Sequence, residues 1–130
     1  MVNEGDFLKI LVVEVADDKV HGLTCFGKIT VFWDGNTPEI GTAYDVELDI
    51  ESVLVWGKDV ILVNDESFAI DYDGELALLH GILESIDDDG YAVMRMGDYI
   101  IPFLSQGEFF DVGSRIIIYI DSISAAPVSY

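Results

Sequence analysis

The sequence predicts an all-β fold, an antiparallel sandwich or barrel of roughly eight to ten strands with at most a short helix. Short runs of β-branched and aromatic residues alternate with turns rich in Gly, Asp and Pro. One segment alternates strictly between apolar and acidic side chains, and the two halves of the chain are weakly similar. Together these observations favour two related β units within a single domain of residues 1–130.

In the first half, turn residues divide the chain into apolar segments. The segment Asp34–Pro38 is the clearest loop, because Asp, Gly, Asn and Pro favour turns. Gly57–Asp59 is expected to turn the chain again. The predicted strands of this half are residues 7–16, 20–26, 28–33, 44–56 and 60–63.

In the second half, Asp87–Gly90 has the composition of a hairpin turn, since Asp-Gly tolerates positive φ angles. Residues 75–85 are ambiguous: their Leu and Ala content allows a short helix, whereas the matching segment of the first half is typical of a strand. Arg115–Ile120 is apolar on both faces, which predicts a central or covered strand. The predicted strands are residues 76–86, 91–96, 99–104 and 115–124.

The internal repeat spans residues 7–56 and 76–124. An offset of 70 residues aligns Glu14 with Glu84, Asp17 with Asp87, Gly27 with Gly97 and Trp33 with Phe103. Two extra residues in the second copy are then expected, after which Gly41-Thr42 aligns with Gly113-Ser114. Similarity at a fixed offset predicts duplicated supersecondary units.

The charge of the chain restricts its partners. Twenty-five acidic residues against six basic ones give a net charge of −19. Direct nucleic-acid binding and adsorption to an anionic membrane are both disfavoured, because each needs clustered Lys and Arg. The single cysteine, Cys25, excludes an internal disulfide, and segment 1–6 is acidic where a secretory signal would be basic. We therefore expect a cytoplasmic protein.

No arrangement of residues predicts catalysis, so we expect no enzyme. His21 and His80 are the only histidines, and Cys25 is the only thiol. A nucleophilic triad needs a nucleophile, a base and an orienting acid, and the sequence offers no motif of this kind. We expect a buried thiol at Cys25, a turn histidine at His21 and a hydrogen-bonded histidine at His80.

No cofactor or metal is expected either. Zinc motifs and a phosphate-binding glycine loop are absent from the sequence. Asp71–Gly74 and Asp87–Gly90 superficially resemble calcium loops, but an EF-hand places its ligands at alternate positions and ends in a distant Glu. Solvated turns are the simpler interpretation.

The candidate binding surface is a row of carboxylates on one predicted strand. Apolar residues alternate there with acidic ones, so the period of two directs the carboxylates to one face. Charges on an outer strand face also occur simply as a solvated surface, and both interpretations remain open. A neighbouring loop adds two acids and aromatic candidates for anchors. The predicted partner-binding residues are Asp45, Glu47, Asp49, Glu51, Asp34, Glu39, Trp33 and Tyr44, with Trp56, Phe109 and Phe110 as further possible anchors.

In size, acidity and lack of catalytic groups, the chain resembles the immunity proteins that bacteria make against secreted toxins. No motif carries this resemblance, and no family residue is transferred. It implies an inhibitor that binds a basic toxin such as a nuclease. Three alternatives remain open: a nucleic-acid mimic, a structural or assembly module associating through Ile116–Ile120, and a small-ligand or carbohydrate-binding β domain. A homodimer is compatible with the sequence.

The net charge predicts that stability depends on salt. Lowering the ionic strength from about 0.1 M to about 0.01 M lengthens the Debye screening distance from about 10 Å to about 30 Å. The carboxylates then repel one another more strongly, and the melting temperature should fall. Thermal melts at both ionic strengths and one pH measure this. Equal or greater stability at low salt would mean that the acidic residues are locally compensated.

Overall fold

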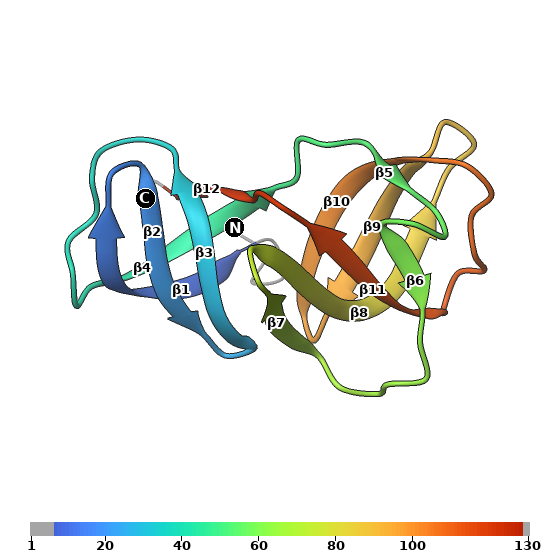
Figure 1. The fold of residues 1–130 in the computed structure, drawn as a ribbon, viewed down its shortest axis with the longest axis horizontal. Helices are drawn as coiled ribbons and strands as arrows, with labels where there is room; N and C mark the ends of the chain where they lie inside the picture. Colours follow the sequence, from blue (N-terminus) through green and yellow to red (C-terminus); the bar gives the residue numbers. More distant parts are fainter. Residues whose placement is uncertain (1–6, 129–130) are drawn as a thin grey trace.

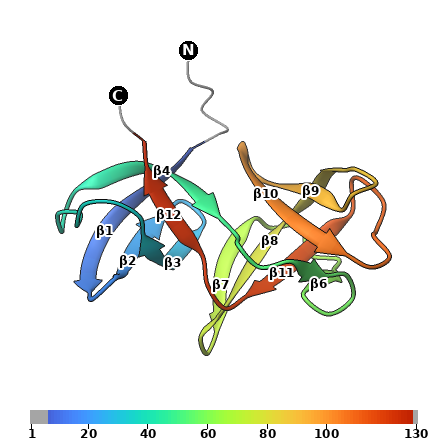
Figure 2. The same cartoon turned by 90° about the horizontal axis from the view of Figure 1, so that it is seen from above.

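The computed structural model describes residues 7–128, which form strands and no helix. The all-β prediction is therefore confirmed. Segment 1–6, used above to argue against a secretory signal, lies outside the described residues. Two β units lie side by side (Figures 1 and 2). The strands are β1 (Leu8–Ala16), β2 (Lys19–Thr24), β3 (Gly27–Trp33), β4 (Ala43–Asp49), β5 (Leu54–Val55), β6 (Val60–Leu62), β7 (Ala69–Asp73), β8 (Leu76–Ile86), β9 (Tyr91–Met96), β10 (Tyr99–Gln106), β11 (Arg115–Ile120) and β12 (Ser124–Pro127).

The first unit is a closed barrel in the order β1-β2-β3-β12-β4. β1 pairs antiparallel with β2 and β4, and β12 closes the gap between β3 and β4. The β12 strand runs parallel to β3, which departs from the antiparallel architecture predicted. Closure covers the end of β3 at Phe32 and Trp33 with β12, so among the described residues the barrel has no fully exposed edge strand.

The second unit is a sheet in the order β5-β10-β9-β8-β11-β6, with β7 paired to the first part of β8. A bridge between Trp56 and Val60 brings its two outer strands together, so the sheet is nearly closed. Here β5 runs parallel to β10, the counterpart of the β12–β3 pair. The β11 strand lies between β8 and β6, which confirms the central position expected for Arg115–Ile120.

The two units exchange their closing strands. The chain leaves β4 of the first unit and supplies β5 and β6 to the second. It later leaves β11 of the second unit and supplies β12 to the first (Figure 2). Each unit is thus completed by a segment from the other half of the sequence.

This exchange explains why two predicted strands are too long. Residues 44–56 were expected as one strand, but β4 ends at Asp49 and β5 is only Leu54–Val55. Residues 115–124 likewise divide into β11 and β12. At both breaks the chain crosses between units and loses its pairing partners. Of the ambiguous residues 75–85, all but Glu75 lie within strand β8, and β7 was not predicted.

The two halves agree at the level of strand order, and the predicted correspondence of Gly41 with Gly113 is reproduced in their hydrogen bonds. Gly41 N donates to Val12 O at 2.8 Å, and Gly113 N donates to Leu83 O at 2.8 Å. The alignment of Gly27 with Gly97 is out of register, because Gly27 pairs with Thr24 where the second unit pairs Tyr99 with Met96. The shift begins before the first hairpin: Val12 of β1 corresponds to Leu83 of β8, and Glu14 to Ser85, so Glu14 does not correspond to Glu84. The longer hairpin turn of the second unit then adds one more residue.

Hydrogen bonds join the units directly. Leu48 N, in β4, donates to the hydroxyl of Tyr99 at 2.9 Å, and this contact is buried. Ile70 N, in β7, donates to Phe26 O at 2.9 Å. Because the Leu48 and Tyr99 groups are inaccessible to water, each depends on a protein partner.

Replacing Tyr99 by Phe should destabilise the protein by about 1–3 kcal/mol, because the buried Leu48 N–H loses its acceptor. Urea unfolding measures the change in the free energy of unfolding. Tyr91→Phe is the matched control, since the Tyr91 side chain is exposed. Equal effects of the two substitutions would contradict a specific role for the Tyr99 hydroxyl.

Candidate functional site: an acidic groove

Strand β4 directs its carboxylates outward as predicted. Val46 and Leu48 are buried in the barrel, whereas Glu47 and Asp49 are exposed on the opposite face. Asp45 lies on the same face but contacts Lys9, with Oδ1 3.2 Å from Nζ. The alternation inferred from the sequence is therefore present, and one member of the row is paired with a cation.

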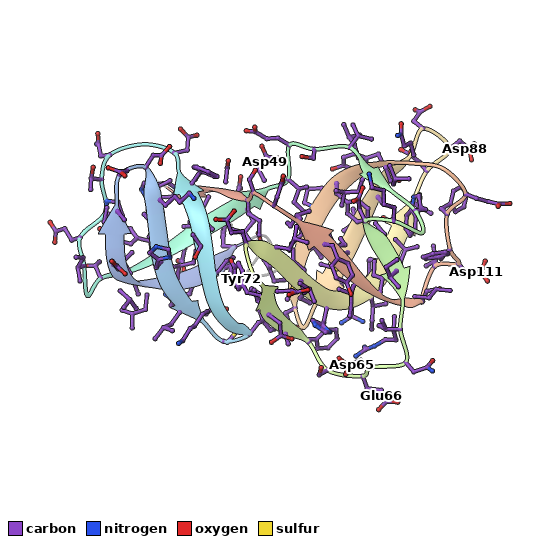
Figure 3. The ribbon with its side chains drawn as sticks, viewed as in Figure 1. Asp49, Asp65, Glu66, Tyr72, Asp88 and Asp111 are labelled. Carbon is purple, nitrogen blue, oxygen red and sulfur yellow. The ribbon has the colours of Figure 1, made fainter. Side chains whose placement is uncertain are left out.

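The exposed carboxylates border an open groove of about 620 Å³ on the outside of the barrel. It runs over β3, β12 and β4, and the second unit contributes Pro102. Figure 3 shows Asp49 at the upper edge of the molecule, near the junction of the units. The groove is lined by Phe32, Trp33, Asp34, Glu47, Leu48, Asp49, Glu51, Pro102, Ser124, Ala125 and Ala126, and none of these is basic.

Small residues on β12 help to make the groove. In the register of the barrel, Ala126 lies opposite Glu47, and Ser124 lies opposite both Asp49 and Phe32. Their short side chains leave a depression between the longer ones of β3 and β4. The sequence did not predict that β12 forms the floor of the groove, because β12 is far from β3 and β4 in the sequence and its first residue was assigned to the preceding strand.

Two of the predicted anchors, Trp33 and Tyr44, mainly pack within the barrel. Their rings meet edge to face, with centroids 5.3 Å apart, and both lie against the buried core. The Tyr44 hydroxyl accepts the Glu39 N–H at 2.9 Å, which fixes the neighbouring loop. Trp33 also lines the groove, and its buried Nε1 has no hydrogen-bond partner in residues 7–128. Glu39 is exposed but does not line the groove.

The other possible anchors belong to the second unit. Phe110 packs edge to face on Trp56, with ring centroids 5.0 Å apart, and Trp56 is buried. Phe109 is half exposed. None of the three lines the acidic groove, so the structure separates them from the carboxylates.

The groove has the electrostatics of a cation-binding surface. Alternate residues of a strand lie about 7 Å apart, and two carboxylates at that distance repel by about 0.6 kcal/mol in water. Covering such a surface with an apolar partner would remove water from several like charges and raise that cost. Lysine or arginine side chains would instead offset the repulsion and bond to the carboxylates.

His80 forms a separate cluster that joins three segments. Its ring is buried; Nδ1 lies 3.0 Å from Asp65 Oδ2 and Nε2 lies 3.0 Å from Asp71 Oδ2. The Nδ1 contact is a hydrogen bond, whereas Nε2 lacks the alignment of one. Arg115 Nε donates to Asp65 O at 2.9 Å. The cluster attaches β7 and the preceding loop to β8 and β11, which is a structural role.

The remaining groups considered from the sequence lie apart. Cys25 is exposed in the β2–β3 turn, so the buried thiol expected there is wrong. His21 lies within β2, not in a turn, and its Nδ1 is 2.7 Å from Thr30 Oγ1. Asp87 Oδ1 accepts the N–H groups of Asp89 and Tyr91, so this carboxylate stabilises its own turn. Among the described residues, no three His, Cys, Asp or Glu side chains gather closely enough to hold a metal ion.

No family model matches the chain, and neither the curated proteins nor the solved structures include a significant match. Residues 7–128 contain no helix long and apolar enough to cross a membrane. The geometry of the chain itself is therefore the basis for a functional proposal.

Asp65 predicts a defined pH dependence. Hydrogen bonds from the backbone N–H of Ser67, then from its hydroxyl, lower the pKa of Asp65; desolvation opposes them, and smaller contributions from His80 lower the pKa further. The stabilisation should be fully present above the ordinary aspartate pKa of about 3.9 and lost as the pH falls through the lower folded value.

The substitution Asp65→Asn isolates this effect. Urea unfolding of wild type and variant should give a constant difference in stability above about pH 5, and the difference should shrink in stronger acid as Asp65 itself is protonated. A difference that persists unchanged at the acid end would contradict the proposed charge dependence. Glu66→Gln, at an exposed neighbour, is the control.

Proposed function

We propose that this chain is a protein-binding protein whose acidic groove receives a basic surface of its partner. The observation that carries the proposal is the convergence of Asp34, Glu47, Asp49 and Glu51 on one groove that contains no basic residue. These four residues come from the end of β3, from β4 and from the following crossover. Three members of the predicted row, Glu47, Asp49 and Glu51, thus border the groove, whereas Asp45 does not line it.

The physical basis of such binding is attraction at long range followed by close contact. A chain with a net charge of −19 attracts a basic partner over the Debye distance, which can raise the association rate to about 10⁸–10⁹ M⁻¹s⁻¹. Inside the groove, Lys or Arg side chains would lie among the carboxylates. Phe32, Pro102 and the alanines of β12 supply apolar surface for the aliphatic parts of those side chains.

Within this class, we propose an inhibitor of a basic toxin such as a nuclease. Small size, strong acidity and the resemblance to immunity proteins support this choice. A toxin that acts on nucleic acid needs a basic active site, because it must bind phosphates, and an acidic inhibitor can cover that site. The exposed free thiol of Cys25 supports a reducing compartment such as the cytoplasm.

Charge reversal in the groove tests the proposal. Glu47→Lys with Asp49→Lys should leave the fold intact, because both side chains are exposed, and should abolish capture of a basic protein from extracts of the native host. The matched control is Asp88→Lys with Asp111→Lys, which changes the net charge equally at the outer end of the second unit, away from Asp49 (Figure 3). The control should retain the captured protein.

Binding kinetics with the captured partner then locate the contact. If the two carboxylates lie at the rim, reversal should mainly slow association and weaken its dependence on salt; if they are buried against Lys or Arg, each should cost about 2–5 kcal/mol and speed dissociation. Unchanged kinetics in the groove variant, with loss of binding in the control, would move the site to the Asp87–Asp89 turn. Loss of binding in both variants would mean that binding depends on the net charge of the protein and not on the groove.

A further inference from the structure

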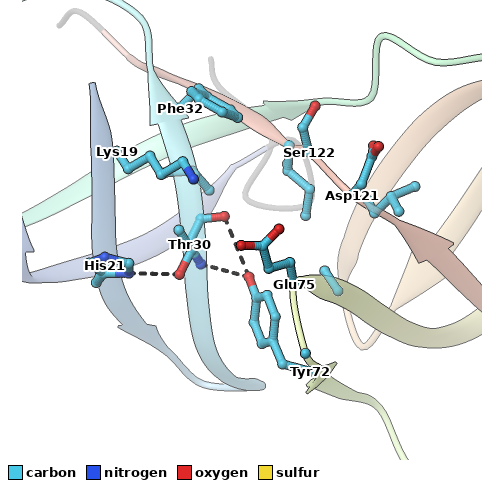
Figure 4. Close-up of a pocket in the computed structure, with 13 residues that line it drawn as sticks. Lys19, His21, Thr30, Phe32, Tyr72, Glu75, Asp121 and Ser122 are labelled. Carbon is cyan, nitrogen blue, oxygen red and sulfur yellow. Dashed lines mark hydrogen bonds between the residues drawn. The ribbon is translucent and has the colours of Figure 1, made fainter. Parts of the chain in front are cut away.

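A second cavity, of about 240 Å³, lies between the two units (Figure 4). One wall comes from β2 and β3 of the barrel. The opposite wall comes from the β7–β8 turn and from the crossover that links β11 to β12. Drug-sized ligands occupy cavities of about 300–1,000 Å³, so the volume of this one restricts an occupant to a smaller molecule.

The two walls carry opposite charges. Lys19 lies on the barrel wall, with Nζ 5.5 Å from the centre of the Phe32 ring, while Glu75 and Asp121 lie on the other wall. Figure 4 shows the side chains of Lys19 and Glu75 pointing into the space between the units. Within residues 7–128, no ion pair within 4 Å involves any of these three groups. The cavity therefore has a positive wall and a negative wall, and the charged groups of the two walls do not form ion pairs with each other.

Hydrogen bonds hold the frame of the cavity. The Thr30 N–H donates to the Tyr72 hydroxyl at 2.7 Å, which connects β3 of one wall to β7 of the other. The Thr30 hydroxyl is also 2.7 Å from Nδ1 of His21 on the adjacent strand. The β7 end of one wall is thus attached to the barrel before any ligand binds, which lowers the entropic cost of binding.

We infer that this cavity binds a small zwitterion, an α-amino acid with a small apolar side chain. Its ammonium group would lie between Glu75 and Asp121, and its carboxylate would contact Lys19. The ring of Phe32 and the buried Ile120 and Ile123 supply an apolar surface for its side chain. This assignment does not rest on the acidic groove, with which the cavity shares only Phe32.

The charge of the whole chain favours a zwitterion over a simple anion. An anion bound at Lys19 would also face two carboxylates and the field of the net −19 charge, both of which repel it. A simple amine would satisfy Glu75 and Asp121 but leave Lys19 without a partner. Only a ligand with both charges complements both walls.

Calorimetric titration with glycine, alanine and valine tests the inference, with the amide of each amino acid lacking the carboxylate and the N-acetyl form lacking the ammonium. We expect saturable binding of at least one free amino acid and a loss of about tenfold or more in affinity for each of its derivatives, the change that corresponds to about 1.4 kcal/mol. Absence of saturable binding by all three amino acids, or equal binding of a derivative, would overturn the inference.

Two substitutions, one on each wall, locate the binding. Lys19→Met and Asp121→Asn should each weaken binding of the amino acid about tenfold or more, while Asp88→Asn, an equivalent loss of charge in the β8–β9 turn, should not. All three residues are exposed, and circular dichroism checks that each variant is folded. If Asp121→Asn fails to fold, Glu75→Gln replaces it on the same wall; if Lys19→Met fails to fold, Lys19→Gln replaces it. Undiminished affinity in a folded wall variant would place the ligand elsewhere and overturn the assignment.

Discussion

The pairing of backbone hydrogen-bond groups is the constraint on which this structure depends. Four consecutive strands cannot close either unit, because the gap between β3 and β4, and the matching gap beside β10 and β11, would leave buried N–H and C=O groups unpaired. The chain fills each gap with a segment from the other half. The two crossovers, the parallel pairs and the position of both cavities follow from this exchange.

The acidic groove is a direct product of the exchange. Strand β12 inserts short side chains between β3 and β4, so the carboxylates of β4 border a depression in place of a flat surface. The second cavity, which Lys19 lines, depends on the same segment, since the crossover that carries Asp121 continues into β12. Two surfaces of different chemistry therefore share one structural element.

Local patterns predicted local structure well. The alternation of Val46 and Leu48 with acidic residues placed the carboxylates on the correct face, and the apolar composition of Arg115–Ile120 indicated a central strand. Pairing between distant segments was not predictable, because the composition of Ser124–Pro127 carries no signal for its partner β3. Trp33 and Tyr44 show the same limit. Aromatic residues beside a charged loop are typical both of an interface and of a barrel interior, and only the tertiary structure shows that these two pack against the core.

The late position of β12 has a consequence for synthesis on the ribosome. Residues 8–49 contain four strands of the first barrel, yet the closing strand begins at Ser124, so the barrel stays incomplete until β12 has emerged, more than 70 residues after β4. Contacts between residues so far apart in sequence slow folding and prolong the exposure of apolar surface. During that interval, the dense negative charge keeps nascent chains apart, a protective role that needs no partner.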